Sequence, residues 1–203
     1  MRIGFGWDSH AFKPGVPLRI GGLSIEHPEG LAGHSDGDVL LHAITDALLG
    51  AVSAGDIGSF FPPGDPRWKN ADSAIFLKTA LEEVATAGYK IVNIDTVLVL
   101  AAPKIGPIAG ELRERVAELL QIKPGDVGIK AKTPEGLDQD HVAIAHAAVL
   151  LEPIGSTSDL ARMTASMEAE SEIDAVVKNL VAEEPLGTGL KRKMPIYDTG
   201  DLT

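Results

Sequence analysis

Residues 36–50 form an apolar segment that carries three ionisable side chains at four-residue intervals, Asp38, His42 and Asp46. Side chains four residues apart stack on one face of an α-helix. Apolar residues fill most of the other positions, so the pattern predicts a helix that is largely buried. A buried stripe of two carboxylates and an imidazole needs neutralising partners. The rest of the chain therefore has to cover this helix and supply those partners.

The first predicted strand, residues 2–12, can supply them. Residues two apart in a strand point to the same side, so Asp8 and His10 can converge with His42 across a cleft. Two imidazoles and one carboxylate leave one coordination position open, which suits catalytic zinc. Asp46 or Asp38 could then orient a ligand imidazole through its other nitrogen. The alternative is structural, because an Asp at a helix start usually acts as a cap.

Composition limits the class of protein. The net charge of -11 over 203 residues argues against a general nucleic-acid binder and against adhesion to anionic membranes. A phosphorylated substrate stays possible, because a metal can supply local positive charge. There are no cysteines, so any metal must bind to His and carboxylate groups. No apolar stretch reaches membrane-spanning length and the chain opens directly on a strand, so we expect a cytoplasmic protein.

Hydrophobic periodicity predicts alternating strands and amphipathic helices up to residue 153. We expect strands at 2–12, 91–101, 126–133 and 142–152, helices at 36–52, 72–88 and 106–121, a hairpin-like pair at 18–26, and loops at 27–36 and 55–65. This order predicts an α/β (α+β) domain over residues 1–153, with helices packed on a sheet. Residues 154–203 lack a strong core pattern and are expected to be a C-terminal extension, either helical or disordered.

Three further stretches can carry chemistry. His34 and Ser35 precede the long helix, where free backbone N–H groups and the helix dipole favour an anion; a capping turn is equally consistent with this position. Lys104 follows a strand and could bind phosphate, or simply be exposed. Residues 130–135 place a hydroxyl and a carboxylate at the end of a strand, where a polar turn is the alternative.

Together these stretches resemble the 2-C-methyl-D-erythritol 2,4-cyclodiphosphate synthase family of the non-mevalonate isoprenoid pathway. The resemblance covers residues 1–152 in order. The matching motifs are Arg2-Ile-Gly-x-Gly-x-Asp-x-His10, Ile20-Gly-Gly22, His34-Ser-Asp-Gly-Asp-Val-x-x-His-Ala-x-x-Asp-Ala-Leu-Leu-Gly50, Gly55-Asp-Ile-Gly58, Phe61-Pro-x-x-Asp65, Ala71-Asp-Ser73, Ala102-Pro-Lys104 and Lys130-Ala-x-Thr133.

The resemblance implies a mixed four-stranded sheet with helices on one face, assembled as a homotrimer with active sites between neighbouring subunits. It implies a lyase that acts on 4-diphosphocytidyl-2-C-methyl-D-erythritol 2-phosphate. In this reaction the 2-phosphate of the substrate attacks its β-phosphorus, expels CMP and closes a cyclic diphosphate.

The resemblance also assigns site residues. Zinc would bind to Asp8, His10 and His42, a second divalent ion (Mg or Mn) would bind to Glu135, and His34 and Thr133 would stabilise the transition state. Residues 56–58 would touch the methylerythritol part, residues 61–65 would close over the site, and 100–106 with 132–135 would hold the cytidine diphosphate. The implied substrate contacts are Asp8, Ser9, His10, His34, Ser35, Asp56, Ile57, Gly58, Phe61, Pro62, Pro63, Gly64, Asp65, Leu100, Ala101, Ala102, Pro103, Lys104, Ile105, Gly106, Lys132, Thr133, Pro134 and Glu135.

One stretch departs from the family pattern. Relatives usually carry Gly-Arg-Gly-Glu after the position of Glu135, whereas this chain reads Gly136-Leu-Asp-Gln-Asp-His-Val142 and has no arginine between Arg115 and Arg162. An arginine clamp on the nucleotide phosphates is therefore not expected. Two alternative functions follow: a metal-dependent phosphohydrolase that uses water as the nucleophile, or a non-catalytic trimeric scaffold whose C-terminal extension binds a partner.

Overall fold

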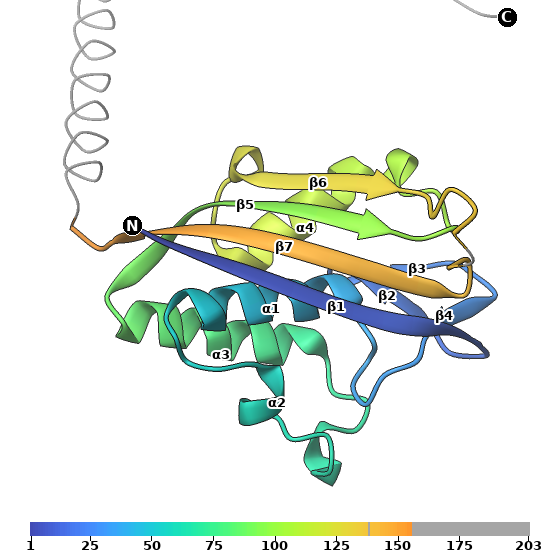
Figure 1. Ribbon diagram of the computed structural model, residues 1–203, viewed down its shortest axis with the longest axis horizontal. Helices are drawn as coiled ribbons and strands as arrows, with labels where there is room; N and C mark the ends of the chain where they lie inside the picture. Colours follow the sequence, from blue (N-terminus) through green and yellow to red (C-terminus); the bar gives the residue numbers. More distant parts are fainter. Residues whose placement is uncertain (138, 156–203) are drawn as a thin grey trace, which may run out of the picture. The chain divides into compact units, whose positions relative to one another are not determined.

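In the described part of the chain, a five-stranded mixed sheet forms one layer and helices form the other (Figure 1). The computed structural model describes residues 1–137 and 139–155, so nearly all of the expected extension 154–203 lies outside the described residues, and the domain boundary stays a prediction. The strands are β1 (Arg2–Pro14), β2 (Leu18–Ile20), β3 (Leu23–Ile25), β4 (Glu29–Leu31), β5 (Tyr89–Val99), β6 (Val127–Lys132) and β7 (Val142–Pro153). The helices are α1 (Val39–Ala51), α2 (Ile57–Phe60), α3 (Ser73–Thr86) and α4 (Ala109–Leu120), with 3₁₀ turns η1 (Pro66–Trp68), η2 (Gly106–Ile108) and η3 (Pro124–Asp126).

The sheet has the strand order β4-β1-β7-β5-β6. Strands β5 and β6 are parallel, and the other neighbouring pairs are antiparallel. The expectation of a four-stranded sheet is wrong, because the sheet has a fifth strand, the short β4. Strand β4 lies in the segment predicted as a loop. Strand β4 exists because β1 continues two residues beyond Phe12, so that Phe12 pairs with Leu31 and Pro14 with Glu29. The predicted hairpin is confirmed as the separate β2–β3 sheet.

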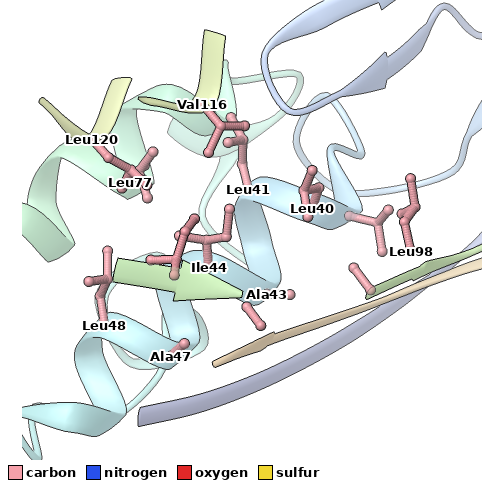
Figure 2. Close-up of a cluster of buried hydrophobic side chains, with 14 of the residues drawn as sticks. Leu40, Leu41, Ala43, Ile44, Ala47, Leu48, Leu77, Leu98, Val116 and Leu120 are labelled. Carbon is pink, nitrogen blue, oxygen red and sulfur yellow. The ribbon is translucent and has the colours of Figure 1, made fainter. Parts of the chain in front are cut away.

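Helix α1 is the centre of the core, as its apolar pattern predicts. Asp38 caps it by accepting a hydrogen bond from the N–H of Leu41 at 3.0 Å. Every residue of the helix except Asp46 and Gly50 is buried. Figure 2 shows its large side chains facing Leu77 of α3 and Val116 and Leu120 of α4, while Ala43 and Ala47 lie on the side nearest the strands.

Two glycines of β1 allow α1 to approach the sheet closely. A Cβ atom at Gly4 would lie 1.8 Å from the carbonyl oxygen of Ala47, and one at Gly6 would lie 1.9 Å from that of Ala43. Neither separation is physically possible, so only glycine permits this packing distance. The close approach sets the height of His42 above β1, the strand that carries Asp8 and His10.

Among the described residues, none covers the opposite face of the sheet. Ile3, Phe5 and Trp7 of β1 are 76%, 66% and 51% exposed. They pair with Leu150, Ala148 and His146 of β7, so an apolar surface runs across two adjacent strands. Within the part of the chain that the structure describes, no helix is long and apolar enough to cross a membrane.

Candidate metal centre and substrate site

The structure brings Asp8, His10 and His42 together, as the strand and helix spacings predict. Oδ2 of Asp8 lies 3.0 Å from Nε2 of His10 and 2.9 Å from Nδ1 of His42, and the two nitrogens are 3.0 Å apart. Tetrahedral zinc, with bonds of about 2.0–2.1 Å, separates its ligand atoms by about 3.3 Å. Small outward shifts of these side chains would therefore create a three-ligand set, and the residues fit a divalent metal.

The electrostatics of the cluster favour a bound cation. Burial alone would raise the pKa of Asp8, but hydrogen bonds with His10 and His42 outweigh it and hold the pKa of this carboxyl well below its ordinary value. Burial would lower the pKa of His10, but its bond to Asp8 outweighs burial and raises that pKa. Asp8 is thus ionised over a wide pH range and ready to act as a ligand, while a metal would have to compete with the proton that His10 binds more tightly.

The far side of His42 has partners that differ from those predicted. Its Nε2 lies 2.8 Å from Oγ of Ser73 and 3.0 Å from Oγ of Ser35. The expectation that Asp46 or Asp38 orients a ligand imidazole is wrong, because among the described residues the hydrogen bonds of both carboxylates go to backbone N–H groups and not to His10 or His42. Asp38, completely buried, accepts hydrogen bonds from the N–H groups of residues 21, 22 and 41, and Asp46 accepts one from the N–H of residue 57.

A cavity of about 220 Å³ opens beside the three ligands. It collects several residues that the sequence assigns to substrate binding, together with Asp46 of the helix stripe, and it adds Trp68 and Phe76, which sequence reasoning missed. Its lining residues are Asp8, His10, His34, Ser35, His42, Asp46, Ile57, Gly58, Phe61, Pro63, Trp68 and Phe76. Aromatic packing forms one wall, since the ring centroid of Phe61 lies 4.4 Å from the ring centroid of Phe76 and 4.9 Å from that of Trp68.

The loops that bound this cavity are held by local hydrogen bonds. Asp56 caps α2 by accepting from the N–H of Ser59 at 2.8 Å. Asp65 caps the η1 turn and forms an ion pair with Arg67. Nε2 of His34 lies 3.3 Å from the carbonyl oxygen of Asp65, which joins the segment before α1 to the 61–65 loop.

A second cavity, of about 450 Å³, lies at the carboxyl ends of β5 and β6. Because these two strands are parallel, the segments that follow them meet at one edge of the sheet. The predicted nucleotide-binding segments therefore come together here. The lining residues are Leu100, Pro103, Lys104, Ile105, Gly106, Ala109, Ile129, Ala131, Lys132, Thr133 and Glu135. The hydroxyl of Thr133 donates a hydrogen bond to the carboxylate of Glu135.

The predicted site residues do not all lie in one cavity of the single chain. His34 lines the first cavity and Thr133 the second. Figure 1 shows α2, beside the first cavity, and the carboxyl end of β6, beside the second, far apart in the molecule. Eight predicted contacts lie outside the residues that line these two cavities: Ser9, Asp56, Pro62, Gly64, Asp65, Ala101, Ala102 and Pro134.

Fold and site together define an α+β protein in which a helix-covered mixed sheet carries a candidate divalent-metal centre of one Asp and two His. Residues 1–152 match the YgbB family, and the chain belongs to this family. It is 64% identical over 152 residues to the 2-C-methyl-D-erythritol 2,4-cyclodiphosphate synthase of Koribacter versatilis (strain Ellin345), covering 75% of this chain and 98% of that protein.

Further relatives agree. The synthase of the same name from Aquifex aeolicus (strain VF5) is 49% identical over 151 residues, covering 74% of this chain and 97% of that protein. A solved structure of a 2C-methyl-D-erythritol-2,4-cyclodiphosphate synthase in a CDP-bound form matches with a TM-score of 0.71 and 43% identity, covering 74% of this chain and all of that one. The family resemblance inferred from the motifs is confirmed.

Proposed function

We propose that the chain converts 4-diphosphocytidyl-2-C-methyl-D-erythritol 2-phosphate into 2-C-methyl-D-erythritol 2,4-cyclodiphosphate and CMP, as a lyase of the non-mevalonate isoprenoid pathway. The observation that carries this proposal is the match to a synthase of that name along 98% of its length. The convergence of Asp8, His10 and His42 beside a cavity supports it, since these residues can hold a cation next to a phosphorylated substrate.

The chemistry agrees with the side chains present. An oxygen of the 2-phosphate forms a bond to the β-phosphorus, and the bond from this phosphorus to the bridging oxygen breaks, so that CMP leaves with that oxygen. Phosphoryl transfer of this kind depends on positioning and charge neutralisation more than on a strong base. The nucleophile is already a phosphate, so no activated serine or cysteine is needed.

Two cations fit the donor groups. Zinc held by Asp8, His10 and His42, and magnesium or manganese held by Glu135, would neutralise phosphate charge when bound. His34 and Thr133 can each donate a hydrogen bond to a phosphate oxygen and so stabilise charge that develops in the transition state. The bond from Thr133 to Glu135 has to open for these roles, which ties the hydroxyl to the occupancy of the second ion.

We infer that the working unit is a homotrimer in which the first cavity of one copy faces the second cavity of its neighbour. The separation of His34 from Thr133 supports this arrangement, because one chain does not bring them into one site. The exposed apolar face around Phe5 and Trp7 supports it as well, since a surface of this kind marks an interface. The nucleotide would occupy the cavity between Leu100 and Glu135.

The alternatives receive less support. A phosphohydrolase or a non-catalytic scaffold would retain the fold, but the relatives named above, which match along nearly their full length, are synthases. A location in the cytoplasm stays a prediction from the sequence.

The test is to incubate the full chain with the proposed substrate and follow CMP release. We expect turnover that a chelator abolishes and that zinc with magnesium restores. His42→Ala should remove activity and zinc binding and leave a folded protein, whereas His27→Ala should leave both intact, because His27 contacts the carbonyl of Glu29 away from the cluster. A fully active His42→Ala variant would overturn the proposal.

A further inference from the structure

The side of His42 that faces away from Asp8 and His10 carries a hydrogen-bond chain that the proposed function does not use. Nε2 of His42 lies 2.8 Å from Oγ of Ser73, and this hydroxyl donates to Oδ1 of Asp36 at 2.5 Å. Ser73 is the first residue of α3 and Asp36 lies in the segment before α1, 37 positions earlier. Ser73 is completely buried and His42 nearly so, hence the bond between them is shielded from bulk water.

The donors and acceptors among His42, Ser73 and Asp36 fix the direction of each hydrogen bond. An ionised carboxylate only accepts hydrogen bonds, and a serine hydroxyl has one proton to give. The proton of Ser73 goes to Asp36, so the oxygen of Ser73 must accept from His42. Nε2 of His42 therefore carries a proton. When a metal is bound, the lone pair of the imidazole is then on Nδ1, the atom that faces Asp8 and His10.

Further hydrogen bonds hold Asp36 in place. Its Oδ2 accepts from the N–H of Ser73 at 3.1 Å, and its Oδ1 also accepts from the N–H of Asp38 at 3.2 Å. Its own N–H donates to the carbonyl of Ala71 at 3.0 Å. The carboxylate is thus attached to the beginning of both α1 and α3. Its position relative to His42 is set by the packing of two core helices rather than by a free side chain.

We propose that Asp36 and Ser73 are positioning residues of the metal centre, which hold the ring of His42 in the orientation and tautomer that present Nδ1 to the cation. This inference rests on the metal centre of the proposed function. Partners of this kind raise the basicity of a ligand imidazole and fix its ring, and their loss typically weakens metal binding about 10–100-fold. Neither residue contacts the cation in this account, so both act through His42.

The first test measures zinc affinity of the full chain by competition with a chromogenic chelator. Ser73→Ala should weaken zinc binding about 10–100-fold, and Asp36→Asn should weaken it in the same direction. In the Ser73→Ala background, Asp36→Asn should cause a smaller loss than it does alone, because the link from Asp36 to His42 is already broken and only the bonds of Asp36 to backbone N–H groups remain. The matched control is Asp72→Asn, which removes one charge at the start of the same helix from a side chain that accepts from the N–H of Ala74 within α3. Its zinc affinity should stay within twofold of wild type.

Two outcomes would overturn the positioning role. One is a zinc affinity of Ser73→Ala within twofold of wild type. The other is a double variant whose fold-loss of zinc affinity equals the product of the fold-losses of the two single variants. Failure of the wild-type protein to bind any divalent cation would instead overturn the metal centre, and this inference with it.

A second test needs no variant. Long-range ¹H–¹⁵N correlation spectra of the zinc-loaded wild-type protein, with ¹⁵N-labelled histidine, report which nitrogen of His42 keeps its proton. We expect the proton on Nε2. A proton on Nδ1 would contradict the proposal even if the Ser73 and Asp36 variants did not fold.

Discussion

Oδ1 of Asp46 accepts a hydrogen bond of 2.8 Å from the backbone N–H of Ile57, and this bond connects the helix that carries His42 to the segment that begins α2. Burial raises the pKa of Asp46, and the nearby charges of Asp56 and Asp8 raise it further. The folded protein therefore binds this proton more tightly than the unfolded chain does. Between the ordinary carboxyl value near 3.8 and the raised value, the Asp46 contribution makes the folded state less stable as pH rises.

Asp46→Asn tests this pH dependence, because the amide oxygen can still accept from Ile57 but carries no charge. In protein stripped of divalent metal, we expect the free energy of unfolding of the variant, relative to wild type, to increase from pH 4 to pH 7. Urea unfolding at a series of pH values measures the difference. A difference that is constant with pH would show that the pKa of Asp46 is not raised.

The packing of α1 on β1 gives a second prediction. A methyl group at Gly6 would meet the carbonyl oxygen of Ala43, so Gly6→Ala must push the helix away from the strand. We expect a loss of stability of about 1–3 kcal/mol, together with weaker zinc binding, since His42 would move relative to Asp8 and His10. Thermal unfolding and zinc titration measure the two effects.

Gly50→Ala is the matched control, because it lies in the same helix and a methyl group there meets nothing within 4 Å. This change should raise stability by up to about 1 kcal/mol, the helix-propensity difference between the two residues. Equal behaviour of the two variants would contradict the close-packing account.

The sequence predicted much of the fold and of the metal centre because both depend on local periodicity. Spacing alone placed His42 on a buried helix and aligned Asp8 with His10, and the structure brings the three together. Strand β4 was missed because it has only three residues and is ordered by pairing with the end of β1. The bond from Ser73 to His42 joins residues 31 positions apart, so no local pattern could reveal it.

The family resemblance supplied roles that the residues alone left open, such as those of His34 and Thr133. The structure separates these two residues into different cavities of one chain, a relationship that no spacing within the sequence could give. Geometry within one chain thus supports the metal centre directly. In the proposed homotrimer, the complete site would depend on how the copies assemble.

Assembly can be tested on the apolar face of the sheet around Phe5 and Trp7. Phe5→Asp places a charge in the proposed interface and should dissociate the trimer and remove activity. Ile75→Asp is the matched control, because it makes the same kind of change at a residue of α3 that is 47% exposed; it should stay trimeric. Light scattering after gel filtration should give three times the chain mass for wild type and the control. A wild-type protein that is monomeric and fully active would contradict the shared-site arrangement.

The altered loop after Glu135 predicts a low affinity for the nucleotide part of the substrate. Arginine binds phosphate through a rigid pair of donors, whereas Lys104 and Lys132 offer only single ammonium groups. Loss of one such contact should weaken binding by roughly 1.5–3 kcal/mol. The effect should appear mainly as a raised KM with little change in kcat. Grafting Gly-Arg-Gly-Glu into the loop between Glu135 and Val142 should lower KM about tenfold or more, and an unchanged KM would refute the explanation.

The central claim is that phosphate, not water, attacks the β-phosphorus. The most direct measurement is phosphorus NMR of the reaction of the wild-type protein with 4-diphosphocytidyl-2-C-methyl-D-erythritol 2-phosphate in water enriched in ¹⁸O. We predict equal amounts of CMP and a cyclic diphosphate, with no ¹⁸O in either product, because no water oxygen enters the new bond. A linear product with ¹⁸O on its terminal phosphate would mean hydrolysis, and absence of CMP in the presence of zinc and magnesium would mean no catalysis; either result would contradict the account.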